Sequence, residues 1–346
     1  MESSFPNEWN SASIISIPKK GDLSKFNNYR GISLINGGLK IPTKIVTDRI
    51  SKYAFEHNFI KPEQFGFRNH EEYISLYIFI REICQRRKFK SKFTYVVFLD
   101  MKKSIRLCSH FQHSYKKSFT LVSVTNVLIS FLISILLLKL ELVTLICYQI
   151  NFLFIVVIRQ SCPLSSILFN LFINDILNNC DKYGVSICNK KCCGDLFADD
   201  IVLIGPNERK IKALLRHIFC LANKNEMSFG INKCDTIVIK PLNFVSYPVY
   251  EEPTFYLGMY SIHIYLGISF SNDLSFEPII TYMNSKVKKS LFSFSSFLSN
   301  NKVPLTFKRS IIQLYIISKV LYFAPLLGSN KNNSKNVQSL INTALL

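Results

Sequence analysis

The sequence predicts an α+β fold, because segments with helical periodicity and short apolar strands both occur along the chain. Apolar residues recur at helical spacing over residues 40–55, where Ile41, Ile45 and Ile50 share one face. β-branched and aromatic residues fill residues 94–99, as is typical of a buried strand. A chain of 346 residues is long enough for roughly two or three domains with buried cores.

Apolar spacing and turn residues justify the predicted elements in chain order. The strand at residues 94–99 is expected to stop at Asp100, and the pair Asp199-Asp200 is expected to lie between two apolar runs. The tail beyond about residue 270 is helical in pattern and basic. The expected helices cover residues 40–55, 74–84, 162–176 and 210–223, and the expected strands cover residues 94–99, 185–187, 196–204 and 236–239.

The charge of the chain indicates the kind of partner that it binds. There are 42 Lys and Arg residues against 23 Asp and Glu residues, which gives a formal net charge of +19. So basic a chain is expected to bind a polyanion, with nucleic acid the first candidate and an anionic membrane surface the second. Hydrophobic residues make up 48% of the chain and no low-complexity tract occurs, so general disorder is excluded.

The cysteines and the N-terminal residues bear on location. The N-terminus has no basic stretch followed by an apolar one, so no signal peptide is expected. The ten cysteines are therefore expected to be reduced, in an intracellular protein of the nucleus or the cytoplasm. No Cys-x-x-Cys spacing occurs, which favours a buried strand over a zinc site for the one cysteine cluster. That cluster consists of Cys180, Cys188, Cys192 and Cys193.

Three aspartates are candidate catalytic residues. Asp199 and Asp200 form an adjacent pair between apolar runs, where their charges repel each other. A divalent cation would relieve that repulsion, because Mg²⁺ prefers carboxylates together with phosphate oxygens; an exposed Asp-Asp turn is the simpler alternative. Asp100 follows the apolar strand at residues 94–99. If the two strand ends are neighbours, the three carboxylates form the donor set of a two-metal phosphoryl-transfer site.

Seven short motifs follow one another along the chain. They cover residues 12–34 (ASIISIPKKGDLSKFNNYRGISL), 63–68 (EQFGFR), 97–103 (VFLDMKK), 159–176 (RQSCPLSSILFNLFINDI), 196–203 (LFADDIVL), 229–233 (FGINK) and 265–268 (YLGI). In this order and at these spacings they resemble the reverse transcriptase domain of a non-LTR (LINE-like) retrotransposon, over nearly the whole chain except residues 104–158. The resemblance implies an α+β right-hand polymerase fold, with fingers over residues 1–99, a palm with an antiparallel sheet over residues 100–268, and a partial helical thumb over residues 269–346.

The resemblance also implies an activity, that of an RNA-directed DNA polymerase. Such an enzyme extends a DNA primer on an RNA template with deoxynucleoside triphosphates. Asp100 matches the first catalytic aspartate of the family, and Asp199 and Asp200 match the remaining pair. These three would hold Mg²⁺, or Mn²⁺ in its place. Lys233 matches the lysine that assists the departure of pyrophosphate, with an exposed turn lysine as the alternative.

Contacts to nucleic acid and nucleotide are implied for further residues. Arg30 and Arg68 match fingers residues near the incoming nucleotide and the template, with a phosphate contact or a solvated position as the alternative for each. Gln160 and Ser161 match the loop that contacts the template and the nascent base pair. Phosphate neutralisation dominates template–primer binding, so the other basic residues need no base specificity. The primer grip matches Tyr265, Leu266 and Gly267.

Five positions depart from the pattern of the family. Ile105 stands where an aromatic residue would select against a ribose 2′-hydroxyl, and Arg106 stands where an acid is usual. Ser161 and Asp195 occupy positions that are usually glycine, and Asp235 occupies a small-residue position. The departures leave the three aspartates intact, but they make a degenerate, catalytically inactive retroelement fragment the alternative to an active enzyme.

Residues 104–158 differ in kind from the rest of the chain. They contain no Gly, Pro or Asp, and Leu, Ile, Val and Phe dominate their later part. The separation of Asp100 from Arg159 is nevertheless ordinary for the family, which favours a compensated pair of frameshifts in the gene. A membrane span over residues 127–158 is a second interpretation, disfavoured because neither apolar run reaches roughly 18 residues. A buried replacement helix is a third.

Two wider expectations follow. A membrane span would make the chain a membrane-associated basic protein, which is the less favoured functional alternative. The chain begins within the predicted fingers and ends within the predicted thumb, and no endonuclease or CCHC knuckle is recognised in it. We therefore expect a fragment of a longer element.

Overall fold

The computed structural model describes residues 12–19, 22–25, 28–68, 72–102, 162–187, 190–224, 227–230, 233–242, 258–328 and 331–345. Residues 104–158 lie outside the described residues, so their three interpretations stay predictions. Gln160 and Ser161 also lie outside, as do Ile105 and Arg106. Within the described ranges, no helix is both long enough and apolar enough to cross a membrane.

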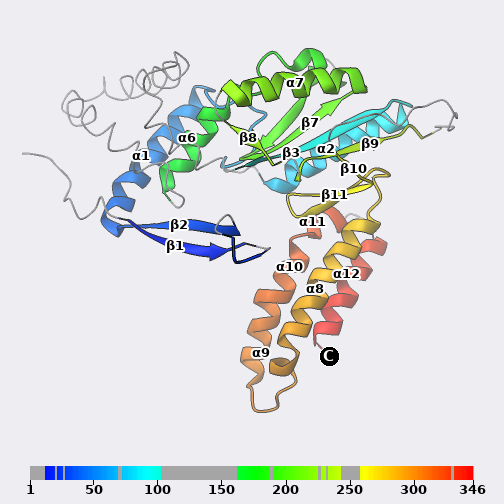
Figure 1. Cartoon of the computed structure of the whole chain (residues 1–346). Coiled ribbons are helices and arrows are strands. Elements are labelled where there is room, and N and C mark those ends of the chain that lie inside the picture. Colours follow the sequence, from blue (N-terminus) through cyan, green and yellow to red (C-terminus); the bar gives the residue numbers. More distant parts are fainter. Residues whose placement is uncertain are drawn as a thin grey trace, which may run out of the picture.

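A sheet at the centre of the protein carries the acidic residues (Figure 1). Within the described residues it has six strands, in the order β10-β9-β3-β7-β6, with β8 pairing beside β3. Its pairings are antiparallel except for the one between β9 and β10, which is parallel. The strands are β3 (Thr94–Lys102), β6 (Gly194–Phe197), β7 (Asp200–Gly205), β8 (Ser228–Phe229), β9 (Asp235–Ile239) and β10 (Gly258–Met259).

Strand β3 is central, and both of its faces are buried. Val96 and Phe98 contribute to one hydrophobic cluster, whereas Val97, Leu99 and Met101 contribute to the other. This division follows from strand geometry, in which successive side chains point to opposite faces. A strand covered on both sides needs a continuous apolar run, which explains the composition of this segment.

Helices cover both faces of the sheet. The amphipathic helix α7 places Ile211, Leu214, Leu215 and Ile218 on one side at positions i, i+3, i+4 and i+7, and these residues pack against the face that includes Val97. On that face α7 is joined by α6, while α2 packs on the opposite face beside the hairpin formed by β11 and β12. The bounds are α2 (Tyr73–Phe89), α6 (Pro163–Ile173), α7 (Glu208–Lys224), β11 (Ile262–Tyr265) and β12 (Ile268–Ser271).

Helix α1 (Gly37–Glu56) packs against α6. Leu39 and Ile50 of α1 lie in one buried cluster with Leu164 of α6. The helix begins after Asn36, whose side-chain oxygen accepts the N–H of the second helical residue at 2.9 Å. This capping bond satisfies one of the N–H groups that a helix start leaves without an internal partner.

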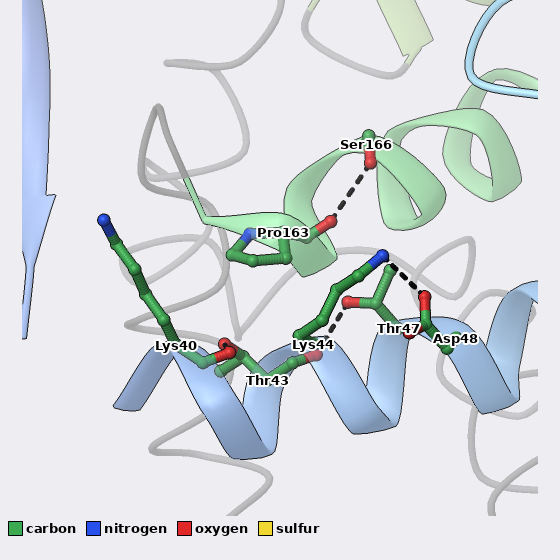
Figure 2. Close-up of polar contacts among 7 residues, drawn as sticks. All are labelled: Lys40, Thr43, Lys44, Thr47, Asp48, Pro163 and Ser166. Carbon is green, nitrogen blue, oxygen red and sulfur yellow. Dashed lines mark hydrogen bonds and ion pairs between the residues drawn. The ribbon is translucent and has the colours of Figure 1, made fainter. Parts of the chain in front are cut away.

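Polar side chains of α1 and of the start of α6 form hydrogen bonds within their own helices (Figure 2). The Thr47 hydroxyl donates to the carbonyl of Thr43 at 2.7 Å, and the Ser166 hydroxyl donates to the carbonyl of the first residue of α6 at 3.1 Å. On the exposed side of α1, Lys44 Nζ lies 2.7 Å from an oxygen of Asp48. Because the hydroxyls of Thr47 and Ser166 bond to carbonyls of their own helices, neither of them needs a partner on a neighbouring element.

An antiparallel hairpin of β1 (Ala12–Pro18) and β2 (Tyr29–Ile35) lies apart from the central sheet (Figure 1). Three of its isoleucines, Ile14, Ile15 and Ile17, are exposed. Because neighbouring strand residues point to opposite sides, both faces of the hairpin present apolar side chains.

The C-terminal part is helical, as the sequence predicts, and extends away from the sheet (Figure 1). Met283 and Val287 of α8 pack with Ile316 and Val320 in the hydrophobic cluster that also contains α2 and one face of the sheet. The C-terminal helices and the sheet therefore share a continuous core. The elements are α8 (Glu277–Leu298), α9 (Leu305–Ile311), a π-helical turn (Ile312–Ile317), α10 (Ser318–Leu321), α11 (Ala324–Leu327) and α12 (Lys331–Leu345).

The predicted helices correspond to α1, α2, α6 and α7, and the predicted strands to β3, β4, β6–β7 and β9. The prediction was wrong about the end of β3 and about the position of Asp200. β3 does not stop at Asp100 but continues to Lys102, because Asp100 pairs with Asp200 and the next two residues pair with β8. Asp200 does not lie between the strands but opens β7.

The described cysteines are free, and most of them are buried. Cys192 ends the short strand β5 (Lys190–Cys192), which pairs with β4 (Val185–Ile187), and Cys193 follows it in the core. Cys188 lies outside the described residues.

Candidate active site

The three candidate aspartates lie at one end of the strand pair β3–β7. Asp100 and Asp200 stand directly opposite each other in the register, so their side chains lie on the same face of the sheet. Asp199 and Ala198 form the two-residue turn between β6 and β7. The carbonyl of Asp199 accepts the N–H of Met101 at 3.4 Å. The structure thus brings Asp100 next to the Asp199-Asp200 pair, which lies about a hundred residues further along the chain.

Lys233 contacts the first of these acids. Its Nζ donates to both carboxylate oxygens of Asp100, at 2.9 and 3.1 Å. The connection from β8 to β9 passes over the same residue, since the Gly230 N–H donates to the Asp100 carbonyl at 2.9 Å. A Cβ at position 230 would lie 3.3 Å from a carboxylate oxygen of Asp100, so glycine lets this connection approach closely. The side chain of Lys233 is 69% exposed and that of Asp100 is 28% exposed, so the ammonium reaches the site from solvent.

The electrostatics of the site favour a cation. Burial and, to a smaller extent, the nearby charges of Asp199 and Asp100 together raise the pKa of Asp200 to about 7, while Lys233 acts in the opposite direction. A carboxyl group with so high a pKa has too little positive charge around it to stabilise its ionised form. One lysine, already bonded to Asp100, does not compensate for three adjacent carboxylates.

The donor set fits a hard divalent cation, because carboxylate oxygens are the ligands that Mg²⁺ and Mn²⁺ prefer. A finished ligand cage is not formed: in the part of the chain that the structure describes, no three His, Cys, Asp or Glu side chains converge as metal ligands. The observation that indicates a cation is therefore the raised pKa of Asp200, which is buried beside two other carboxylates, and not a complete set of metal ligands.

The predicted primer-grip residues form the tip of the β11–β12 hairpin. Tyr265 ends β11, and Leu266 and Gly267 make the turn with φ of 49° and 77°. Glycine takes such a backbone conformation without strain. The hydroxyl of Tyr322 donates to the Leu266 carbonyl at 2.5 Å, and its ring stacks on Tyr73 of α2 with centroids 4.5 Å apart. The turn is thus held between α2 and the C-terminal helices.

Tyr265 lies beside the acidic site. Its side chain is buried, and its hydroxyl has no hydrogen-bond partner among the described residues. Burial raises the pKa of Tyr265, and the charges of Asp200 and Asp195 act in the same direction. Its ring also packs on Phe98 of β3, with centroids 4.9 Å apart. The hairpin therefore lies against the strand that carries Asp100.

The residues predicted to bind the template and the nucleotide do not form a single group with the aspartates among the described contacts. Arg30 lies in β2, opposite Ile17 of β1. The guanidinium of Arg68 donates to the carbonyls of Pro62 and Gln64, at 3.3 and 3.4 Å, and thus bonds within its own segment. Gln160 and Ser161 lie outside the described residues, so the structure does not relate them to the aspartates.

Two departures from the family pattern have partners in the structure. Asp235 is hydrogen-bonded to His263 of β11, whose ring stacks on Phe98 with centroids 4.5 Å apart. Burial lowers the pKa of His263, and Asp235 acts in the opposite direction. Asp195 is buried, and the thiol of Cys192 donates to it at 3.8 Å. The sequence motifs contain neither His263 nor Cys192, so they could not predict these two hydrogen bonds.

Burial and, to a smaller extent, the charge of Glu63 together raise the pKa of Asp195 to about 7. Asp195 thus lies close to a second negatively charged side chain, that of Glu63 in the segment beside β6. Gln64 lies next to Glu63 and contacts that turn directly. Sequence reasoning missed Gln64, although it lies in the motif at residues 63–68.

The fold and the clustered aspartates are those of a template-copying polymerase. Residues 17–261 match the family described as reverse transcriptase (RNA-dependent DNA polymerase). This match spans most of the chain, and the chain belongs to the reverse transcriptase family. Membership confirms the predicted right-hand polymerase fold class, and neither the inactive fragment nor the membrane-associated protein is favoured by it.

A relative and a solved structure extend the comparison. Over 123 residues the chain is 29% identical to the retrovirus-related Pol polyprotein from type-2 retrotransposable element R2DM of Drosophila melanogaster. The match covers 33% of this chain and 12% of that protein. It confirms the predicted resemblance to non-LTR retrotransposons. The structure of telomerase from Candida albicans in complex with the TWJ fragment of telomeric RNA covers 98% of this chain and 56% of its own, at 10% identity and a TM-score of 0.39.

Proposed function

We propose that this chain is an RNA-directed DNA polymerase domain of a retrotransposable element, which extends a DNA primer on an RNA template. The observation that carries the proposal is the register of β3 and β7, which sets Asp100 opposite Asp200 with Asp199 in the adjoining turn. Membership of the reverse transcriptase family supports the same reaction. The division into fingers, palm and partial thumb at residues 1–99, 100–268 and 269–346 is part of the proposal, as is a nuclear or cytoplasmic location.

Asp100, Asp199 and Asp200 would hold Mg²⁺, or Mn²⁺ in its place. When bound, two such ions would lower the pKa of the attacking primer hydroxyl and stabilise charge on the pyrophosphate leaving group. Binding of these ions would offset the mutual repulsion of the three carboxylates. It would also release the proton that Asp200 holds in part near neutral pH because of its raised pKa. The Nζ of Lys233 donates to Asp100, and this ammonium would supply the proton to the leaving pyrophosphate.

The remaining predicted residues would bind substrates. Tyr265, Leu266 and Gly267 would support the primer end, and the bond from Tyr322 to the hairpin turn supports this role. Arg30, Arg68, Gln160 and Ser161 would contact the template or the incoming deoxynucleoside triphosphate. The net charge of +19 supports binding of both nucleic acids through their phosphates.

Primer extension on a homopolymer RNA template tests the proposal. We expect incorporation by the wild type with Mg²⁺ or Mn²⁺, and a loss of at least about a thousandfold in Asp199→Ala, since electrostatic stabilisation of the transferring phosphoryl group depends on the carboxylates. The matched control is Asp48→Ala, which removes an exposed acid on α1. Folded wild-type protein that incorporates nothing, or an Asp199→Ala variant as active as the control, would refute the proposal.

A further inference from the structure

The segment that contains Gln64 runs alongside β6 as far as the turn that carries Asp199. Gln64 forms a parallel bridge with Leu196. The Phe65 N–H donates to the Leu196 carbonyl, and the Leu196 N–H donates to the Glu63 carbonyl, both at 2.8 Å. Backbone pairing therefore brings the side chain of Gln64 to the end of β6, where the strand turns.

The side chain of Gln64 reaches the backbone of that turn. Its amide oxygen accepts the N–H of Ala198 at 3.2 Å and the N–H of Gly66 at 2.9 Å. Ala198 has a φ of 55°, a conformation that residues with a Cβ adopt only at a cost. The bond from Gln64 holds Ala198 in this conformation, immediately before Asp199.

Gly66 makes the contact possible. A Cβ at position 66 would lie 2.2 Å from the backbone nitrogen of Ala198, so only glycine lets the segment seat against the turn. On the other side, the side-chain amide of Asn170 in α6 donates to the Gly66 carbonyl at 2.7 Å. The segment is thus fixed by α6 on one side and supports the turn on the other.

The surroundings of Gln64 indicate that the hydrogen-bond acceptor of its side chain, and not the size of the side chain, is the reason for a glutamine at this position. The side chain is 2% exposed, and its Nε2 has no hydrogen-bond partner among the described residues. A buried donor without a partner is destabilising, and an apolar side chain of the same size would avoid that cost. Such a side chain would lose the oxygen that accepts the N–H groups of Ala198 and Gly66.

We propose that Gln64 is a positioning residue for the polymerase reaction, whose side-chain oxygen holds the Ala198–Asp199 turn and so fixes where Asp199 and Asp200 lie relative to Asp100. The inference rests on the proposed function for its effect on turnover. Its structural part, the restraint of the turn, stands independently of activity. Gln64 does not touch the reacting atoms and acts through the turn.

The first test compares Gln64→Met with Asn170→Leu. Each variant replaces one buried amide by an apolar side chain of similar size. The Gln64 amide accepts the N–H of Ala198 in the turn, whereas the Asn170 amide donates to the Gly66 carbonyl and, among the described residues, has no bond to the turn. Hydrogen exchange of the Ala198 amide is measured by NMR in the absence of substrate. We expect it to become about fivefold faster in Gln64→Met and to stay within about twofold of the wild type in Asn170→Leu, because only the first variant removes an acceptor from that amide.

Turnover provides the second measurement. With saturating template–primer and nucleotide, kcat is expected to fall about tenfold or more in Gln64→Met, with KM for the nucleotide nearly unchanged, because misplaced reacting groups slow the chemical step. Adding Ala198→Gly to Gln64→Met is expected to restore kcat to within about threefold of the Ala198→Gly single variant, since glycine adopts positive φ without support. A role in general packing would not be rescued by that change.

The outcomes separate the inference from the function on which it rests. If Gln64→Met matches Asn170→Leu in exchange and in kcat, or if Ala198→Gly rescues nothing, the inference is overturned. If the wild type incorporates no nucleotide, the proposed function fails, and the exchange measurement still decides whether Gln64 restrains the turn. Should Gln64→Met not fold, Gln64→Asn takes its place, because the shorter amide keeps its polarity but cannot reach Ala198.

Discussion

Replacing Lys233 by alanine should tighten metal binding while it slows the reaction. In the structure Nζ lies 2.9 and 3.1 Å from the two oxygens of Asp100, so the ammonium occupies a carboxylate that the proposal assigns to a metal ion. A cation must compete with this bond for Asp100. Removal of the lysine therefore favours the metal-bound form, although the same removal takes away the proton that would assist the leaving group.

The magnitude follows from exposure. The lysine side chain is 69% exposed, and ion pairs of this kind contribute about 0.2–1 kcal/mol after screening by solvent. Since about 1.4 kcal/mol corresponds to a tenfold change in an equilibrium constant, the Kd for Mn²⁺ should fall by about 1.4- to fivefold. Loss of general acid catalysis should reduce kcat by roughly a hundredfold or more.

The assay is a Mn²⁺ titration followed by electron paramagnetic resonance, with primer extension measured on the same preparations. Lys44→Ala is the matched control, because Lys44 forms a comparable exposed pair with Asp48 on α1, and it should change neither quantity. Weaker or unchanged Mn²⁺ binding in Lys233→Ala would refute the view that Lys233 competes for the metal site. Unchanged kcat would refute its catalytic role.

Two further predictions concern stability and primer binding. Because burial raises the pKa of Asp195 from 3.8 to about 7, the folded protein holds this proton more tightly than the unfolded chain, so the stabilisation is complete below about pH 4 and is lost as the pH rises through about 7. Asp195→Asn should therefore raise the free energy of unfolding more at pH 8 than at pH 5, by a few kcal/mol at most, and equal effects at both pH values in denaturant titrations would contradict this. Tyr322→Phe removes the bond to the Leu266 carbonyl and should lower stability by about 1 kcal/mol and raise KM for the primer several-fold with a smaller effect on kcat; a change confined to kcat would argue against a role in primer binding.

Local patterns predicted much of the fold. Helix α1 and strand β3 could be recognised because apolar spacing and composition are properties of neighbouring residues. The predicted end of β3 was wrong because the strand continues through pairing with β7 and β8, which are distant in sequence. Strand ends that depend on such partners leave no reliable local signal.

The candidate site was predicted in outline but not in detail. The resemblance to a family brought Asp100 together with Asp199 and Asp200, and the register of the sheet agrees with this. The support for the turn, by contrast, comes from Gln64, whose contact spans a large separation in sequence and depends on a backbone amide. Likewise Asp235 departs from the family pattern in sequence, but His263 of the β11–β12 hairpin gives it a hydrogen-bond partner.

Template-directed incorporation by the wild-type chain tests the central claim most directly. On a poly(rA) template with an oligo(dT) primer and Mg²⁺ or Mn²⁺, the account predicts incorporation of thymidine nucleotides over guanosine nucleotides, and its loss in Asp100→Asn although that protein still folds. Incorporation that does not depend on the template base, or that persists in folded Asp100→Asn, would contradict the assignment of this strand pair as a polymerase active site.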